Sequence, residues 1–393
     1  MQKIIFKTTV LLFLLSLVSC QQEEGPAVFY PTLYTIHSPA YFPSDLNIPI
    51  DNAMTVEGIK LGRYLFYEGR LSGRTEADSL MCCATCHIQE YGFESGMNNP
   101  RYKNGKMIGL TGIESTHSML PLVNLVYNKQ GYLWNGRVNA QNNTLGNAAY
   151  GVPAEYPYTF KNIESLVWMM IAAPHEANGN VFKTDTLIRS LSMYPPMFEA
   201  AFGTPEITME RICKAIAQFI RTLNSTNSKF DKYLRGEAQL SDDEMRGYVL
   251  FTTEEGADCF HCHGGSGNAL FSTYSYLNNG LDATIENVGD RFSYTQNPLD
   301  KGAYKVPTLR NIAQTAPYMH DGRFTTLEQV IDQYSEGVKE SATISPLMHH
   351  ASKCGVQLTA QEKIYLKAFL LTLTDTEFLT NPQFSKPQDS RLP

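Results

Sequence analysis

Clusters of positive charge are missing from this chain of 393 residues. No two Lys or Arg residues are adjacent, and 39 acidic residues outnumber 32 basic ones, which gives a formal net charge of -7. Proteins that bind nucleic acid present a dense basic patch to the phosphates. The composition therefore argues against a nucleic-acid partner, while 43% apolar residues are typical of an ordinary globular protein.

Alternating apolar and polar patterns, which indicate β-strands, are also sparse. Gly and Pro interrupt residues 88–160 and 264–306, so we expect long loops there. Helical patterns occur instead in residues 208–223 and 358–373, whose apolar side chains recur every three or four positions. Capping boxes are expected at Ser241 with Glu244 and at Thr359 with Glu362. The sequence predicts a mainly α fold with long loops.

The apolar run near the N-terminus is too short for a membrane-spanning helix of the folded protein. In residues 1–19 it follows Lys3 and Lys7, a pattern typical of an export signal. Ser19 before Cys20 resembles the cleavage box of bacterial lipoproteins, in which the new N-terminal cysteine is acylated. We therefore predict a periplasmic protein anchored to the membrane by lipid on Cys20, with plain secretion as the alternative.

Two Cys-x-x-Cys-His pentads stand about 170 residues apart. The first pentad has its two thiols at Cys83 and Cys86 and ends at His87. The second pentad is formed in the same way by the set Cys259, Cys262 and His263. Disulfides are the ordinary use of cysteine pairs in an oxidising compartment. A disulfide has no need of the following histidine. A zinc site requires four clustered ligands, whereas each pentad supplies at most three, or four in the second pentad if His261 is added.

Covalent haem c uses all three residues of such a pentad. The two thiols bond the porphyrin, and the histidine beside them ligates the iron. We therefore expect two covalent haem groups in this chain. An internal repeat supports two haem domains, because residues 62–66 and 247–251 precede the pentads as GRYLF and GYVLF, and FIRTL and FLLTL close the two halves.

The predicted organisation follows from the pentads, the repeat and the polar segment 224–239, which we interpret as the link between two domains. It comprises a signal peptide (1–19), a tether and N-terminal extension (20–44), an N-terminal cytochrome-c-like domain (45–235), a C-terminal cytochrome-c-like domain (236–380) and a tail (381–393).

Longer motifs give the chain a specific resemblance. Together with both pentads, the stretches LWNGR around Trp134, APHEANG (173–179) and VPTLRNIAQTAPYMHDGRFTTLEQVI (306–331) resemble the bacterial di-haem cytochrome c peroxidases and their MauG-type relatives. The likeness covers residues 45–375. It implies two helical cytochrome-c-like domains, of which the N-terminal one meets hydrogen peroxide and the C-terminal one collects electrons from a donor.

The resemblance also implies roles for single residues. His87 and His263 match the proximal iron ligands, and Trp134 matches the tryptophan between the two haems. Glu176 matches the acidic residue over the peroxide-binding face; on residue type alone it would be read as a solvated surface carboxylate. Thr315 and Pro317 match backbone ligands of a calcium ion, and a side chain near His117 or Ser118 would complete that site.

The distal ligand of the second iron is less settled. The family position falls on Tyr334, where the classical peroxidases have methionine and the MauG-type enzymes have tyrosine. Tyr334 could also be a packed helix aromatic, with Met319 and Met348 as competing ligands. A phenolate favours ferric iron, whereas a thioether favours the ferrous state.

Other positions depart from the family pattern or lie outside it. Residues 103–116 contain no histidine to close the first haem, so we expect that haem to be open unless His117 reaches it. Met169 stands where the family has glutamine. Cys213 is interpreted as a buried thiol, and Cys82 is a candidate for a disulfide with Cys354.

Three functions follow from this pattern. The leading one is a peroxidase that reduces hydrogen peroxide to water with electrons from a small periplasmic c-type cytochrome or similar donor. The second is a MauG-type oxidase that uses peroxide-derived, high-valent haem to modify a protein or small molecule, and the third is a non-catalytic electron carrier. The relatives also suggest a homodimer.

Overall fold

The structure of the protein, a computed structural model, describes residues 29–138, 162–265, 267–286 and 289–393. The chain divides into two compact units, Met1–Tyr30 and Pro31–Pro393, and the second contains every helix and strand that the structure describes. The predicted signal peptide, Cys20 and the insertion at 139–160 lie outside the described residues. Within the described ranges, no helix has the length and apolar character needed to cross a membrane.

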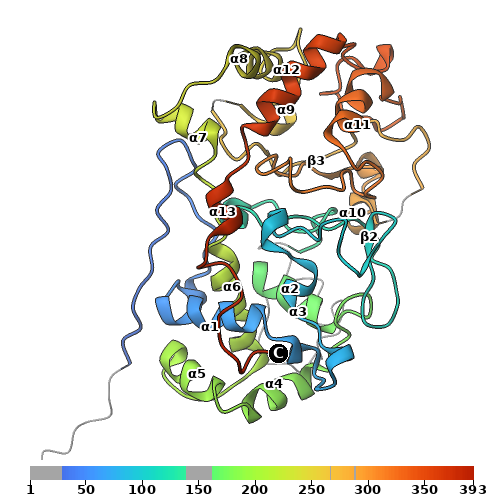
Figure 1. Ribbon diagram of the computed structural model, residues 1–393. Coiled ribbons are helices and arrows are strands. Elements are labelled where there is room, and N and C mark those ends of the chain that lie inside the picture. Colours follow the sequence, from blue (N-terminus) through green and yellow to red (C-terminus); the bar gives the residue numbers. More distant parts are fainter. Residues whose placement is uncertain (1–28, 139–161, 266, 287–288) are drawn as a thin grey trace, which may run out of the picture. The chain divides into compact units, whose positions relative to one another are not determined.

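Helices and loops make up this unit, as the sequence predicts (Figure 1). The α-helices are α1 (Val56–Phe66), α2 (Cys83–Cys86), α3 (Asn162–Ala172), α4 (Val181–Ser190), α5 (Tyr194–Phe202), α6 (Met209–Arg221), α7 (Lys229–Leu234), α8 (Asp242–Phe251), α9 (Phe260–His263), α10 (Arg291–Thr295), α11 (Leu327–Asp332), α12 (Ala360–Leu371) and α13 (Thr376–Thr380). The strands form two antiparallel pairs, β1 (Tyr102–Lys103) with β2 (Lys106–Met107) and β3 (Tyr276–Leu277) with β4 (Tyr304–Lys305).

Both predicted capping boxes are confirmed. Glu244 accepts a hydrogen bond from the backbone N of Ser241 at 2.7 Å, and α8 begins at Asp242. Glu362 accepts one from the backbone N of Thr359 at 2.8 Å, at the start of α12. Each pair satisfies backbone donors that the first helical turn leaves without partners.

The two largest apolar clusters of the described residues form most of the interior. The first is built largely by α1, α3 and α6, and the second by α8, α11 and α12. Phe230 of α7 packs in the second cluster, although it precedes the predicted boundary at residue 235. The chain then returns to the first cluster, where Phe378 of α13 and Leu392 are buried. The domain limits expected from the sequence stay predictions.

The internal repeat corresponds to a repeated helix crossing. A Cβ on Gly62 of α1 would collide with the carbonyl oxygen of Ala215 in α6, and one on Gly247 of α8 would collide with that of Tyr365 in α12. Only glycine permits backbones to approach so closely. The helix before each Cys-x-x-Cys-His pentad crosses a second helix at this glycine. Close packing at the crossing explains why GRYLF and GYVLF both begin with glycine.

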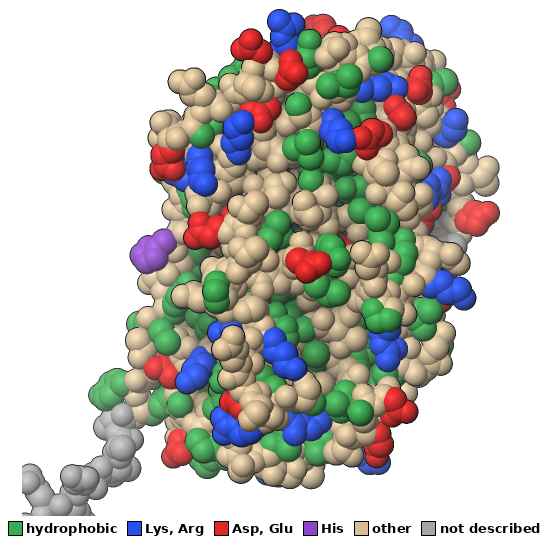
Figure 2. Space-filling model, viewed as in Figure 1, with side chains coloured by type: hydrophobic (Ala, Val, Ile, Leu, Met, Phe, Trp, Pro, Cys, Tyr) green, Lys and Arg blue, Asp and Glu red, His purple; other side chains and the backbone are tan. Residues whose placement is uncertain are grey.

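Charged side chains of both signs are mixed over the face shown in Figure 2, with apolar side chains exposed between them. An ion pair lies in the interior. Arg310 binds both carboxylate oxygens of Asp231 at 2.8 Å, and both side chains are fully buried. This pair ties the motif at 306–331 to α7.

We expect Arg310→Met to lower the free energy of unfolding by about 3–5 kcal/mol, because the Asp231 carboxylate would stay buried without its cation. Urea unfolding of the holoprotein measures the effect. The matched control is Arg323→Met, which breaks the exposed ion pair with Asp282 and should cost no more than about 1 kcal/mol. Equal midpoints for the two variants would contradict a structural role of the buried pair.

Candidate active site

The first pentad places its histidine at the end of a short helix. α2 carries both thiols, and the backbone N of His87 donates to the carbonyl of Cys83 at 2.9 Å. The Nδ1 atom of His87 lies 2.6 Å from the carbonyl oxygen of Phe93, and burial lowers the pKa of His87 to about 4. The ring is therefore neutral with its proton on Nδ1, which leaves the Nε2 lone pair for a metal.

The second pentad repeats this geometry around α9. The Nδ1 atom of His263 lies 3.2 Å from the carbonyl oxygen of Phe271, and burial lowers the pKa of His263 to about 4. Phe93 and Phe271 both adopt the left-handed conformation, with φ values of 60° and 51°. This conformation is uncommon for a bulky residue, and it turns each carbonyl toward its histidine. Neither phenylalanine stands out in the sequence.

A cavity lies beside each histidine. The first cavity, of about 190 Å³, is lined by His87 together with Trp134, Met169 and Glu176. The second cavity, of about 200 Å³, is lined by Cys259, Cys262 and His263, and also by the three candidate distal ligands Tyr334, Met319 and Met348. Mostly apolar walls, two thiols and one neutral imidazole are what covalent haem c requires. The residues present fit one haem beside each pentad.

Glu176 lies in the turn that follows α3, where its backbone N donates to the carbonyl of Ala173 at 3.0 Å. It lines the first cavity and also a small cavity beside Cys83 and Cys86. Burial raises the pKa of Glu176 to about 7. The structure thus places this half-buried carboxyl group in the same cavity as His87, and it can take up or release a proton near neutral pH.

Residues that line both cavities define the boundary between them: Trp134, Lys305 and Pro307. The indole Nε1 of Trp134 donates to the carbonyl of Ser118 at 2.9 Å. Its backbone carbonyl accepts from the backbone N of Lys305 at 2.8 Å. These two bonds fix the tryptophan, which is 9% exposed, between the two sites.

Lys305 is a site residue that the sequence reasoning missed. Its Nζ donates to the carbonyl of Gly131 and to the hydroxyl of Tyr276, and burial together with the charge of Arg291 lowers its pKa well below the ordinary value. It forms no ion pair with an acidic residue in the part of the chain that the structure describes. The signal available in the sequence was its position directly before the long motif at 306–331.

Tyr334 lies in a π-helical turn, Gln333–Gly337, that continues α11. Such turns occur frequently at functional sites. Its hydroxyl accepts a hydrogen bond from Nδ2 of Asn279 at 2.9 Å, and burial raises its pKa to about 12. The same Nδ2 atom lies 3.8 Å from the sulfur of Met319. Asn279, which was also missed because its Asn-Asn-Gly sequence indicates only a turn, contacts two of the three candidate ligands.

The other predicted residues are more scattered. Thr315 is buried, but neither it nor Pro317 lines the two cavities. His117 lines the first cavity and lies edge-on to Tyr304 at 5.5 Å between ring centroids. Ser118 joins this region to the long motif, since its hydroxyl donates to the carbonyl of Met319 at 2.7 Å.

The predicted disulfide between Cys82 and Cys354 is wrong, because both residues are free thiols. Cys82 instead precedes α2, and its sulfur lies 3.6 Å from the hydroxyl of Thr85. Cys213 is buried in the first apolar cluster, which confirms the prediction made from its helix face.

Two pentads with neutral histidines, each beside a cavity in a helical frame, define a protein with two c-type haems. Comparisons with known proteins agree. The Di-haem cytochrome c peroxidase family matches residues 56–239. The cytochrome c551 peroxidase of Nitrosomonas europaea is 31% identical over 278 residues, which is 70% of this chain and 71% of the relative. The methylamine utilization protein MauG of Methylorubrum extorquens is 28% identical over 344 residues, covering 87% and 85% of the two chains.

A solved structure extends the likeness to the whole fold. The crystal structure of a MauG-like protein associated with microbial copper homeostasis is 33% identical, with a TM-score of 0.74, over 91% of this chain and 100% of the other. This chain belongs to the di-haem cytochrome c peroxidase family. It is accordingly an oxidoreductase of the peroxidase type that carries two haem c groups.

Proposed function

We propose that the protein reduces hydrogen peroxide to water in the periplasm, with electrons from a small c-type cytochrome or a similar donor. The observation that carries this proposal is the position of Glu176, which lines the same cavity as His87 and whose pKa burial raises to about 7. Steady-state oxidation of a reduced c-type cytochrome by the holoprotein tests it, and a protein that leaves peroxide intact would contradict it.

The pentads supply the haem attachments in this proposal. Cys83 and Cys86 bond the first haem and His87 ligates its iron, while the second pentad does the same through Cys259, Cys262 and His263. When bound, each haem supplies an iron that changes oxidation state. The hydrogen bonds to Phe93 and Phe271 hold the two imidazoles in the tautomer that such ligation needs.

Glu176 acts as a proton shuttle. It accepts the proton of one peroxide oxygen and returns it to the other, which lets that oxygen leave as water when the O–O bond breaks. The two electrons for this cleavage would come from the haem sites and be replaced by the donor, and the remaining oxygen would leave as a second water after taking up two protons. The group must start as a carboxylate to accept the proton. With a pKa of about 7, its charged fraction grows as the pH rises through neutrality.

We therefore expect kcat/KM for peroxide to rise with pH between about 6 and 8, with an apparent pKa near that of Glu176. The measurement is stopped-flow reaction of the resting holoprotein with peroxide across this pH range. In Glu176→Gln the rise should disappear. An identical pH profile in the wild type and this variant would show that another group carries the proton.

Trp134 and Lys305 line both cavities and would therefore lie between the two haems. The indole ring offers a polarisable path for electrons between the two cavities. Burial lowers the pKa of Lys305, and a carboxylate of a porphyrin bound beside it would favour the charged ammonium form. Lys305→Met should therefore lower the reduction potential of at least one haem, and unchanged potentials would remove this role.

A MauG-type oxidase is the second candidate function, and two observations favour it. Tyr334 lines the second cavity, and the MauG-like protein associated with microbial copper homeostasis matches nearly the whole chain. In this case Tyr334 ligates the second iron through its phenolate, which the N–H of Asn279 would stabilise at 2.9 Å. Slow turnover with cytochrome c and a long-lived oxidised state after one equivalent of peroxide would favour this function.

The Tyr334→Phe variant tests the ligand directly. We expect it to change the absorption spectrum and raise the reduction potential of the second haem only, because the phenolate favours ferric iron. Redox titration followed by visible spectroscopy measures both haems separately. If the second haem is unchanged, the ligand is Met319 or Met348, and replacing each in turn identifies it.

Three further properties are part of the proposal. A calcium ion held by the backbone carbonyls of Thr315 and Pro317 with help from His117 or Ser118 should appear in metal analysis of the purified protein at one equivalent. A lipid on Cys20 should be labelled by radioactive palmitate in the wild type and not in Cys20→Ser. A homodimer should have twice the chain mass in light scattering.

A further inference from the structure

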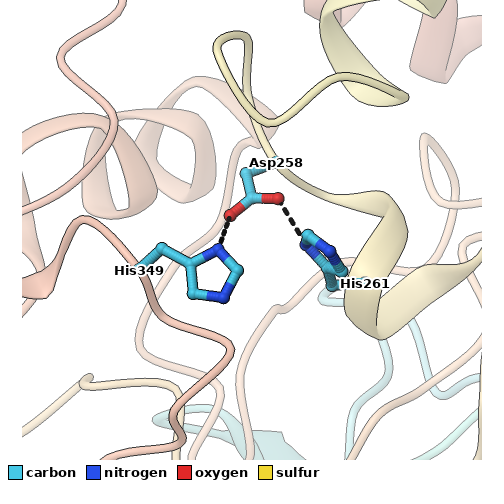
Figure 3. Close-up of side chains that lie close together, drawn as sticks. All are labelled: Asp258, His261 and His349. Atoms are coloured by element: carbon cyan, nitrogen blue, oxygen red, sulfur yellow. Dashed lines mark hydrogen bonds and ion pairs between the residues drawn. The ribbon is translucent and has the colours of Figure 1, made fainter.

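A compact group of side chains that can ligate a metal lies beside the second cavity. It includes none of the residues assigned above to haem attachment or to peroxide chemistry. Asp258 stands between His261 and His349, and both rings point toward its carboxylate (Figure 3). One carboxylate oxygen lies 2.6 Å from Nδ1 of His261, and the other lies 3.4 Å from Nδ1 of His349. One ligand atom from each residue can be chosen so that all three lie within 4.8 Å of one another.

Backbone geometry brings these groups together from two distant segments. Asp258 adopts a left-handed conformation, with φ of 53°, directly before the second pentad, and His349 comes from the loop before α12. The Asp258 side chain is only 5% exposed. Within the described residues it forms ion pairs with the two histidines and with no Lys or Arg. A buried carboxylate of this kind is stabilised by a nearby cation.

A fourth side chain, that of Glu254, lies where it can hold the ring of His261 in place. The Nε2 atom of His261 lies 3.5 Å from a carboxylate oxygen of Glu254. If Nδ1 of His261 binds a metal, its ring proton moves to Nε2 and can be donated to Glu254. Carboxylates in this relation to a ligating histidine orient the ring and strengthen the metal bond.

We propose that Asp258, His261 and His349 form a binding site for one divalent transition-metal ion, Zn²⁺ or Cu²⁺. Two imidazoles and one carboxylate are ligands that suit these ions, whereas Ca²⁺ and Mg²⁺ prefer sets made only of oxygen. The ion would lie between the Asp258 carboxylate and the Nδ1 atoms of the two rings. Side-chain rotations would then bring the three ligand atoms to about 2.0–2.2 Å from it.

The location gives the site a consequence for the second haem. His261 is one of the two residues between the thiols Cys259 and Cys262, and Asp258 and His349 line the second cavity. A divalent cation so close to this haem would favour the electron-rich, ferrous state and so raise its reduction potential. This effect rests on the proposed function of the second pentad, whereas metal binding itself does not.

Calorimetric titration of the untagged holoprotein, first treated with EDTA and dialysed, tests the site with ZnSO₄ and with CuSO₄ as separate probes. We expect one equivalent of metal to bind in the wild type, and the Cu²⁺ form to show nitrogen hyperfine coupling in its electron paramagnetic resonance spectrum. Comparing the two titrations tells which ion the site prefers.

Variants of neighbouring histidines make the test specific. His349→Gln and His261→Gln should abolish binding, and Glu254→Gln should weaken it by about 10–100-fold. The matched control is His350→Gln, because His350 is adjacent to His349 but its ring lies outside the group of three ligands, with Nε2 3.3 Å from the backbone oxygen of Glu254. Each variant must show both haem spectra before titration.

Two results would overturn the site: no metal bound by the wild type, or undiminished binding by both His349→Gln and His261→Gln. A reduction potential of the second haem that stays the same with Zn²⁺ bound would overturn the tuning effect and leave the site in place. Peroxide turnover, measured separately in the EDTA-treated holoprotein without added Zn²⁺ or Cu²⁺, reports on the proposed function alone.

Discussion

Glu176→Gln is expected to lower the rate of peroxide reduction by about 10²–10⁴-fold, the range in which a positioned acid-base group contributes. Glutamine keeps the size and polarity of the side chain in the first cavity but cannot carry a proton between two oxygens. Binding of the substrate should change much less than the rate of the chemical step. Stopped-flow kinetics at pH 8, where most Glu176 carboxyls are charged, gives the largest contrast.

The control is Glu114→Gln, because Glu114 is 43% exposed and pairs with Lys103 on the surface. It should react with peroxide as the wild type does. Both variants should keep two covalent haems with unchanged spectra, which separates a lost proton carrier from a damaged site. A Glu176→Gln protein with more than a tenth of the wild-type rate would contradict the proposed mechanism.

Removal of the second haem is expected to abolish electron delivery. In the double variant Cys259→Ala with Cys262→Ala, no thiol remains to bond the porphyrin beside His263. Cytochrome-dependent turnover should fall to the background rate, because the donor no longer has a route to the first cavity. Intact mass should decrease by one haem, and the second apolar cluster should lose stability because its cavity is left unfilled.

Cys354→Ala is the matched control, since Cys354 is an exposed free thiol outside both pentads. It should keep both haems and full turnover. If the double variant folds too poorly to assay, Cys262→Ala alone retains one thioether bond and should show intermediate turnover. Full activity in a protein that carries only the first haem would remove the electron-entry role from the second pentad.

The parts of the fold that the sequence predicts are those specified by local patterns. The spacing of Ile212, Ile216 and Phe219 on α6 and the capping box at Thr359 each act within one or two helical turns, and both appear in the structure as expected. The pentads are equally local, because covalent haem attachment requires its residues to be adjacent. Such features can be read without knowing the tertiary structure.

Features that depend on tertiary contacts could not be read in this way. Lys305 and Asn279 matter because chain segments far apart in the sequence bring them beside the cavities, and neither has a motif of its own. The disulfide between Cys82 and Cys354 failed for the same reason, since cysteine counts contain no distances. The packing of residues 376–393 in the first cluster could not be predicted from the sequence either. Apolar residues near a chain end do not indicate which cluster they join.

The central claim is that the two haems differ, so that the first has a vacant coordination position for peroxide and the second is ligated on both sides. Electron paramagnetic resonance of the resting, fully oxidised holoprotein tests it most directly. We predict one high-spin and one low-spin ferric signal in equal amounts. Two low-spin signals would contradict the claim, because neither iron could then bind peroxide and the protein would be an electron carrier.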